Sequence, residues 1–172
     1  MPLILFPDPT LKVKLPVFVS EKTEESKHLL SKLILDMEHT MKFTGGIGLA
    51  ANQVGSRIRL FVMGDSRYFI NPVIESGTGE VEIQERCLSF PGVTVRDKRK
   101  ADIVISHEDI EGNLLSWPLE GIDAIVAQHE VDHLNGITFF DYASNVKKNI
   151  IKRKMQKVMR QLKHYQQKKS RK

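Results

Sequence analysis

Residues 128–136 read Gln128-His129-Glu130-Val131-Asp132-His133-Leu134-Asn135-Gly136, and this stretch organises the interpretation of the whole chain. On a helix, His129 and His133 lie one turn apart on the same face, where both imidazoles can bind one divalent metal. Glu130 can reach the open side of that metal, where a carboxylate takes a proton from water. Asn135-Gly136 is typical of a helix C-terminus. The alternative is that two histidines lie one turn apart by chance on a solvated face.

The composition predicts one globular domain in a reducing compartment. The chain has 172 residues, 41% of them hydrophobic, which is enough for a single core. No apolar run approaches the roughly twenty residues that cross a bilayer, so no membrane partner is expected. The N-terminus lacks the features of a signal peptide, and prolines interrupt it. The single cysteine cannot form an internal disulfide, which predicts a cytoplasmic location rather than a secreted one, with an organelle matrix as the alternative.

The spacing of apolar residues predicts an α+β fold. Residues 24–42 follow the helical period, with Met37 and Met41 expected in the core, and a second helix is expected from about Gly121. Short strands are expected at 59–63, 68–70, 80–83, 93–95 and 102–106, followed by a hairpin turn at 109–113 and a return strand at 114–117. We therefore expect antiparallel β-sheets packed around a central helix that carries the metal motif.

A glycine-rich stretch lies between the first helix and the strands. It reads Gly45-Gly46-Ile47-Gly48-Leu49-Ala50-Ala51-Asn52-Gln53-Val54-Gly55. No strand is expected before it, and it lacks the further residues of a dinucleotide loop or a P-loop, which argues against a nucleotide site. Gly46 and Gly48 are instead expected to let the backbone approach a bound ligand, with Ala50 and Ala51 packed behind.

Cys87 is the best candidate for a third metal ligand. A lone cysteine is usually a small buried hydrophobic residue, but two imidazoles make an incomplete site, since catalytic metals usually take three protein ligands and a water. Phe139 stands where a third downstream histidine would be, and no Asp or Glu follows Asp141. Asp141 itself stays a candidate, although an acid that ends a strand near the surface is the simpler interpretation. Cys87, His129 and His133 form the preferred ligand set.

The charge is concentrated at the C-terminus. Residues 147–172 hold twelve Lys and Arg and no acid, whereas the first 146 residues hold fourteen basic and twenty-one acidic residues, a net charge of −7. We expect residues 1–146 to form the catalytic domain and 147–172 a basic amphipathic helix that extends it. The predicted apolar stripe of this helix consists of Val146, Ile150, Ile151, Met155, Val158, Met159, Leu162 and Tyr165.

Three stretches together resemble the signature motifs of peptide deformylases. They are residues 46–53 of the glycine-rich stretch, Glu85-Arg86-Cys87-Leu88-Ser89, and residues 128–133 of the metal motif. The resemblance runs from about Leu3 to Ser144. It implies a hydrolase that removes the formyl group from the N-terminal formyl-methionine of nascent polypeptides and releases formate. It also implies Fe(II) as the native metal, with Zn, Ni or Co able to occupy the site in a preparation.

The resemblance implies a role for each residue of the reaction centre. A metal-activated water would attack the formyl carbon, with Glu130 as general base and then as general acid toward the leaving amine. The Gln53 side-chain amide and the Leu88 backbone N–H would donate hydrogen bonds to the oxyanion. The structural alternative for Gln53 is an amide bonded to backbone at a helix start.

The substrate would lie in an apolar pocket beside the metal. Ile47, Ile122, Ile125 and Val126 match pocket positions of the family, and their alternative role is ordinary core packing. Gly46 and Gly48 would pair with the extended peptide as an added strand, which reads little of the sequence after methionine.

One residue departs from the family pattern. Arg86 stands where the family has glycine, and an arginine there would be strained if the position needs a positive φ. We expect its guanidinium to reach the cleft rim and to change the preference for acidic residues after methionine. Behind the histidines, we expect an ion pair between Arg96 and Asp132.

The basic tail suggests a second partner. Its acid-free surface suits RNA phosphates, and deformylases with such an extension dock at the ribosomal exit tunnel. We expect a monomer, and we expect deletion of residues 148–172 to leave turnover of short peptides near normal while weakening ribosome binding. Two rivals remain: a zinc metallopeptidase in which Cys87 is incidental, and a catalytically weak ribosome-binding relative.

Overall fold

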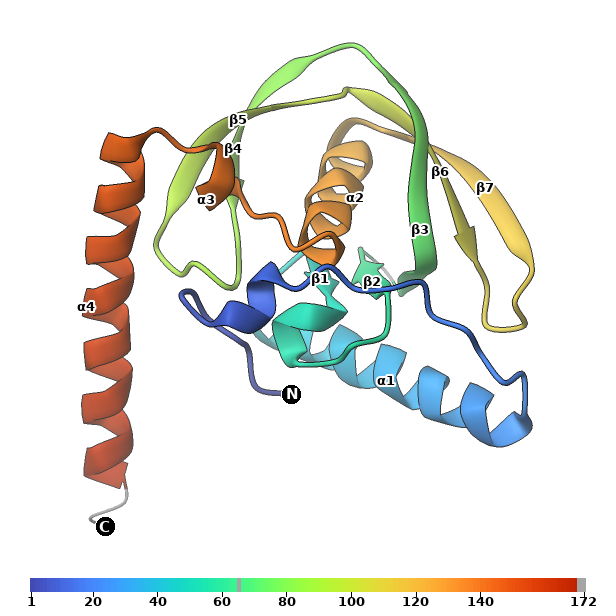
Figure 1. The fold of residues 1–172 in the computed structure, drawn as a ribbon, viewed down its shortest axis with the longest axis horizontal. Coiled ribbons are helices and arrows are strands. Elements are labelled where there is room, and N and C mark those ends of the chain that lie inside the picture. The colour runs from blue at the N-terminus through green and yellow to red at the C-terminus, as the bar shows by residue number, and fades with distance from the viewer. Residues whose placement is uncertain (65, 170–172) are drawn as a thin grey trace.

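The computed structural model describes residues 1–64 and 66–169 of the chain, apart from the side chain of Gln166. Antiparallel strands and helices give the predicted α+β fold (Figure 1). The elements in chain order are η1 (Pro9–Lys12), α1 (Glu24–Phe43), β1 (Gly48–Ala50), η2 (Ala51–Val54), β2 (Leu60–Met63), β3 (Arg67–Thr78), β4 (Val81–Arg86), β5 (Thr94–Arg99), β6 (Asp102–Glu108), β7 (Leu114–Glu120), α2 (Gly121–Leu134), α3 (Phe139–Tyr142) and α4 (Asn145–Lys169).

Two antiparallel sheets lie on either side of α2. The larger has the strand order β1-β2-β3-β6-β7, and the smaller is the β4–β5 hairpin. Figure 1 shows α2 between the hairpin and the strands β3, β6 and β7. The predicted turn between β6 and β7 forms, because the Asp109 side chain accepts a hydrogen bond from the backbone N–H of Asn113 at 2.8 Å. All of the predicted strands lie within or next to observed ones.

The central helix α2 begins and ends where the sequence predicts. It buries Ala124, Ala127 and Leu134 completely, because sheet and hairpin enclose it. Its C-cap is Asn135, and Gly136 follows with φ of 72°. A Cβ at Gly136 would lie 2.4 Å from the Lys12 carbonyl oxygen, so this position needs glycine for both its conformation and its space.

Helix α1 covers the other side of β1 and β2. Its N-cap Thr23 accepts a hydrogen bond from the Ser26 backbone N–H, and Glu24 lies in the first turn, where the helix dipole favours an acid. Met37 and Met41 are buried, as predicted for core residues. Ala50 and Ala51 are also fully buried, as expected behind the glycine-rich stretch.

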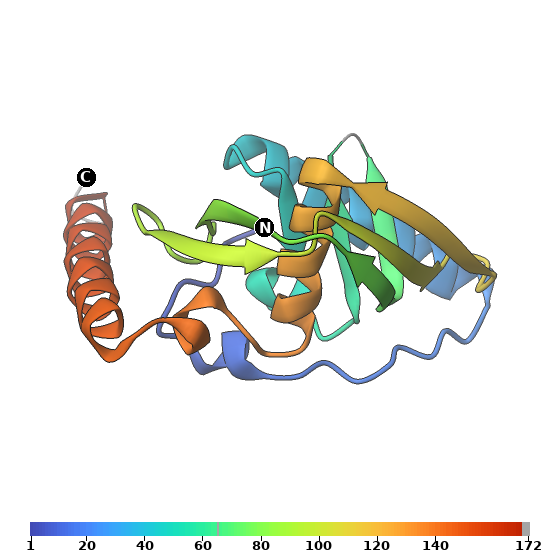
Figure 2. The same cartoon turned by 90° about the horizontal axis from the view of Figure 1, so that it is seen from above.

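Helix α4 stands at one edge of the molecule in both views (Figures 1 and 2). The helix docks through Ile151 and Met155, which are buried in a cluster with Phe90 and Phe139, and Val158 and Met159 are half-buried. Four residues of the predicted apolar stripe are exposed instead: Val146, Ile150, Leu162 and Tyr165. Among the helices described, none is both long enough and apolar enough to cross a bilayer.

Candidate metal centre

The three predicted metal ligands meet at one point. His129 and His133 project from the same face of α2, with ring centroids 4.8 Å apart. Cys87 follows directly after β4, and its Sγ lies 3.1 Å from Nε2 of His133. One donor atom from each of the three residues lies within 4.8 Å of the others. Two donors on one tetrahedral ion are about 3.5 Å apart, so these side chains fit a shared metal.

The electrostatics of the ligands also fit a cation. Burial holds the pKa of His133 well below its ordinary value, which keeps this imidazole neutral, as metal binding requires. Burial alone would lower the pKa of His129, but its contacts with Cys87 and Glu85 raise it well above the ordinary value. The cluster therefore attracts positive charge, which a metal ion would supply.

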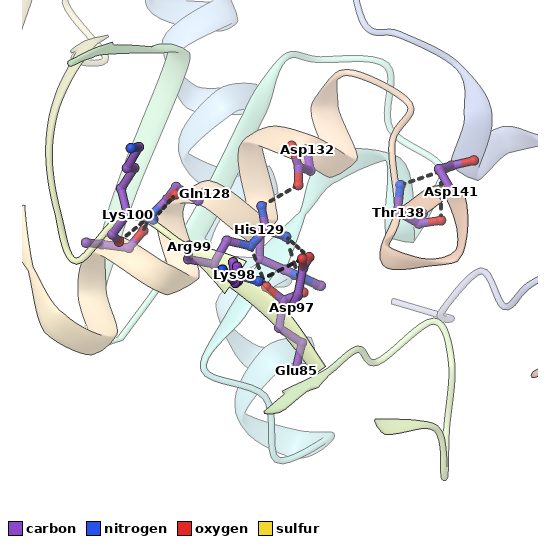
Figure 3. Close-up of polar contacts among 11 residues, drawn as sticks. Glu85, Asp97, Lys98, Arg99, Lys100, Gln128, His129, Asp132, Thr138 and Asp141 are labelled. Atoms are coloured by element: carbon purple, nitrogen blue, oxygen red, sulfur yellow. Dashed lines mark hydrogen bonds and ion pairs between the residues drawn. The ribbon is translucent and has the colours of Figure 1, made fainter. Parts of the chain in front are cut away.

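A buried ion-pair network supports His129 from behind (Figure 3). The Nδ1 atom of His129 lies 3.0 Å from Glu85 Oε2, which leaves Nε2 for the metal. Arg99 donates to Glu85 from Nε at 2.5 Å and to Asp132 from Nη1 at 2.6 Å. Burial would raise the pKa of Glu85, but the hydrogen bonds from His129 and Arg99 lower it to about 2, so the carboxylate stays charged.

The predicted ion pair between Arg96 and Asp132 is wrong. Asp132 binds Arg99 instead, and Arg96 lies on the exposed face of β5. Successive residues of a strand point to opposite faces, so positions 96 and 99 cannot both face α2. The sequence analysis missed Arg99 and also Glu85 as the partner of His129, because the face of a short charged strand depends on its register.

Glu130 lies in a buried position beside the ligands. It is 3% exposed, and its Oε2 atom has no hydrogen-bond partner in the part of the chain that the structure describes. Burial raises its pKa to about 7, which suits a group that both accepts and returns a proton near neutral pH. A Cβ on Gly48 would lie 2.5 Å from Glu130 Oε1. Gly48 therefore leaves the space that this carboxylate occupies.

Gln53 is fixed by both ends of its amide. Its Oε1 accepts a hydrogen bond from the Ala50 backbone N–H at 2.9 Å, so the structural alternative considered for this residue also holds. Its Nε2 points to Cys87 Sγ at 3.5 Å and donates to Ser89 Oγ at 3.1 Å. The amide N–H groups are thus held beside the metal ligands. Ser89 was not identified from the sequence as part of this arrangement.

A cavity of about 430 Å³ opens beside the ligands. Residues from β1, β4 and α2 surround it, and Ile47 and Ile122 lie exposed at its mouth. His133 is the one predicted site residue that does not line it, because it is fully buried behind His129. The predicted site residues that line the cavity are Gly46, Ile47, Gly48, Gln53, Arg86, Cys87, Leu88, Ile122, Ile125, Val126, His129 and Glu130.

Two details of the prediction are settled by local geometry. Arg86 is the last residue of β4 and pairs with Thr94, so its backbone is extended. It therefore lacks the positive φ that would strain an arginine.

Asp141, the alternative ligand, lies outside the cluster of Cys87 and the histidines. Its carboxylate accepts from the Thr138 backbone N–H at 2.8 Å and forms an ion pair with Lys12.

Comparison with known proteins identifies the family. A sequence model described as polypeptide deformylase matches residues 1–149. This chain belongs to the polypeptide deformylase family. A peptide deformylase of Dictyoglomus turgidum is 42% identical over 139 residues, covering 79% of this chain and 88% of that protein. Peptide deformylase 2 of Xanthomonas axonopodis is 38% identical over 164 residues, covering 91% and 95%.

Solved structures agree with this membership. The crystal structure of a peptide deformylase from Legionella pneumophila matches with a TM-score of 0.85 and 34% identity, covering 94% of this chain and 96% of that one. The activity is metal-dependent removal of the N-formyl group from nascent polypeptides, and the metallopeptidase alternative is disfavoured.

Proposed function

We propose that this deformylase holds one divalent metal on Cys87, His129 and His133 and acts on formyl-methionine with the residues around it. The observation that supports this most strongly is the approach of Cys87 Sγ to the two imidazoles of α2, beside the buried Glu130. A thiolate with two imidazoles is a donor set for Fe(II) or Zn, and we propose Fe(II) as the native metal, with Zn, Ni or Co as substitutes. When bound, the metal polarises the formyl group and activates water.

The side chains around the ligands supply the proton transfers and the oxyanion donors. Glu130 accepts a proton from water and returns it to the leaving amine nitrogen, for which a pKa near 7 is well placed. The Gln53 Nε2 and the Leu88 backbone N–H donate to the oxyanion. A neutral amide suits this role, since it donates without titrating. The bond from Gln53 Oε1 to Ala50 keeps the amide from turning.

The cavity accommodates the methionine and the start of the peptide. Ile125 and Val126 lie one turn before His129 on α2 and supply apolar surface for the methionine side chain. Within the described sheets, β1 and β4 each pair with a single strand, so each has a free edge toward the cavity. An extended peptide can add to such an edge through its backbone, next to Gly46 and Gly48.

The first test is formate release from a formyl-Met peptide by anaerobically purified, iron-loaded protein. Cys87→Ala is expected to lose both the metal, measured by elemental analysis, and the activity. A Ser116→Ala variant, which changes an exposed residue of β7 outside the cavity, serves as the control. A Cys87→Ala protein that keeps its metal would contradict the ligand set and would favour the metallopeptidase rival.

We also propose that α4 contacts the ribosome. Its outer surface carries lysines and arginines without any acid. Replacing Lys163, Lys168 and Lys169 by Gln is expected to weaken ribosome binding about tenfold at low salt and to flatten its salt dependence. The matched control replaces Lys14, Lys22 and Lys42, which are exposed on the body. Equal effects of the two triple variants would contradict a role for the tail.

A further inference from the structure

The outer face of the β4–β5 hairpin carries two arginines without an acidic partner. Arg86 lies opposite Thr94, and Gln84 lies opposite Arg96. Opposed residues of antiparallel strands share a face, so Arg86 and Arg96 are diagonal neighbours, about 7 Å apart at Cβ. Both are exposed, and within residues 1–64 and 66–169 neither guanidinium forms a hydrogen bond or an ion pair.

The other basic side chains of this hairpin are neutralised. Lys98 binds Glu80 at 2.8 Å, and Arg99 binds Glu85 and Asp132. The first 146 residues carry a net charge of −7. Glu82 shares this outer face and is the other diagonal neighbour of Arg96, whereas Arg86 has no acid beside it on the hairpin. The Arg86 end of the face is therefore a local positive site on an acidic body.

This positive site lies at the mouth of the cavity. Arg86 directly precedes Cys87 and lines the cavity together with Gln84. Along β4, Glu85 is buried on the face toward α2, whereas Gln84 and Arg86 point outward. Gln84, the neighbour of Arg86 on the outer face of β4, is uncharged and does not compete for its guanidinium.

Strand geometry decides which substrate residue meets Arg86. An extended peptide on the edge of β4 points successive side chains to opposite faces. If the methionine side chain enters the cavity toward Ile125 and Val126 of α2, the next side chain points to the outer face. That is the face of Arg86.

We infer that Arg86, supported by Arg96, forms a carboxylate subsite for an acidic side chain directly after the formyl-methionine. The inference rests on the proposed function, because it needs the methionine in the cavity. A guanidinium offers a planar pair of donors that matches a carboxylate. At an exposed rim such a pair changes kcat/KM by about two- to fivefold.

The test uses peptides formyl-Met-X that differ only in X, with Asp, Asn or Lys, and formate release as the readout. In the parent enzyme, kcat/KM for Asp is expected to exceed that for Asn by about two- to fivefold. Arg86→Gln is expected to bring this ratio close to one, and Arg96→Gln to reduce it less. Arg86→Glu is expected to favour Lys over Asp. The preference should shrink as salt rises.

The control is Arg57→Gln, which removes an exposed arginine outside the cavity and is expected to leave the Asp-to-Asn ratio unchanged. An identical ratio in the parent and in Arg86→Gln would overturn the inference, as would a parent ratio of one. Failure of the proposed function looks different, because then no peptide of the series releases formate.

Discussion

Gly48, which has no Cβ, leaves the space that the carboxylate of the proposed base Glu130 occupies. A Cβ at Gly48 would meet Glu130 Oε1 at 2.5 Å and Val126 Cγ1 at 2.7 Å, which are distances that packed atoms do not adopt. Since Glu130 is 3% exposed, its carboxylate has little room to yield. The glycine is therefore required by the space that Glu130 and Val126 occupy and not by a turn.

Gly48→Ala is expected to lower kcat for formate release by about ten- to a hundredfold, because the carboxylate or the strand must shift by several tenths of an ångström. Metal content should stay close to that of the parent, whereas the free energy of unfolding in urea should fall by about 1–3 kcal/mol, the usual cost of overpacking a buried site. Gly46→Ala is the comparison: its Cβ would meet the end of the half-buried Leu88 side chain, Cδ1, at 2.7 Å and the Gly48 carbonyl oxygen at 3.4 Å, so a smaller loss is expected. A Gly48→Ala enzyme with parental kcat would refute this account of the base.

His107 is a buried histidine of β6 that does not belong to the cluster of Cys87, His129 and His133. It is 2% exposed and packs against Phe69 and Trp117, with ring centroids 4.6 Å and 4.8 Å away. Its Nε2 has no partner among the described residues. Burial lowers its pKa, because the charged imidazolium would lose its hydration.

This lowered pKa makes stability depend on pH. Below about pH 6.5 the unfolded chain protonates His107 and the folded chain does not, so the free energy of unfolding falls with pH until the folded-state pKa is reached. The slope from this residue is at most about 1.4 kcal/mol per pH unit. His107→Phe is expected to flatten the dependence in urea unfolding between pH 7.5 and 5. His28→Gln, at an exposed position, should not change it. If the free energy of unfolding changed with pH equally in the parent and in His107→Phe, this pH dependence could not be assigned to His107.

At the scale of elements, one arginine ties the hairpin to the central helix. Arg99 comes from β5 and bonds to Glu85 of β4 and Asp132 of α2. Its side chain is 9% exposed and that of Glu85 is 4% exposed. Because both charges are buried, each depends on the other, and His129 depends on Glu85 for its orientation.

Arg99→Met is expected to lower the free energy of unfolding by about 3–5 kcal/mol, because it leaves buried carboxylates unpaired. Metal affinity should fall by about ten- to a hundredfold as His129 loses its orientation. Arg96→Gln, three residues earlier on the exposed face, should cost less than about 0.5 kcal/mol. Urea unfolding measures the change in the free energy of unfolding, and metal titration measures the change in metal affinity. Similar losses of stability and metal affinity in the two variants would contradict this role of Arg99 and would support the predicted pairing of Arg96 with Asp132.

The elements were predictable from the sequence to different degrees. Periodicity and caps located α1 and α2 closely, since Thr23, Asn135 and Gly136 have the conformations that their chemistry favours. The metal cluster was also predictable, because a helix fixes the spacing of His129 and His133. The strand register was not, since β5 contains alternating charges on both faces and only the packed sheet decides which arginine turns inward.

At the scale of the whole molecule, the tail is connected to the metal centre through a shared core. Cys87 belongs to the same hydrophobic cluster as Phe90 and Phe139, and Ile151 and Met155 of α4 complete that cluster. The amphipathic pattern predicted a helix but not its partner, because apolar residues at helical spacing extend well beyond the turns that dock. The expectation that residues 148–172 can be removed with little effect on turnover stays a prediction, and the burial of Ile151 and Met155 argues against it.

Two truncations separate the docked and the projecting parts of α4. Deletion of residues 148–172 removes Ile151 and Met155 and is expected to lower the free energy of unfolding by about 3–6 kcal/mol, because each buried side chain contributes about 1.5–3 kcal/mol. Since the exposed cluster contains Cys87, metal retention should fall as well. Deletion of residues 161–172 keeps both side chains, so stability and turnover of a short formyl-Met peptide should stay near those of the full chain. Urea unfolding, elemental analysis and formate release measure these outcomes. If the longer deletion left all three unchanged, α4 would be an appendage and not a part of the catalytic core.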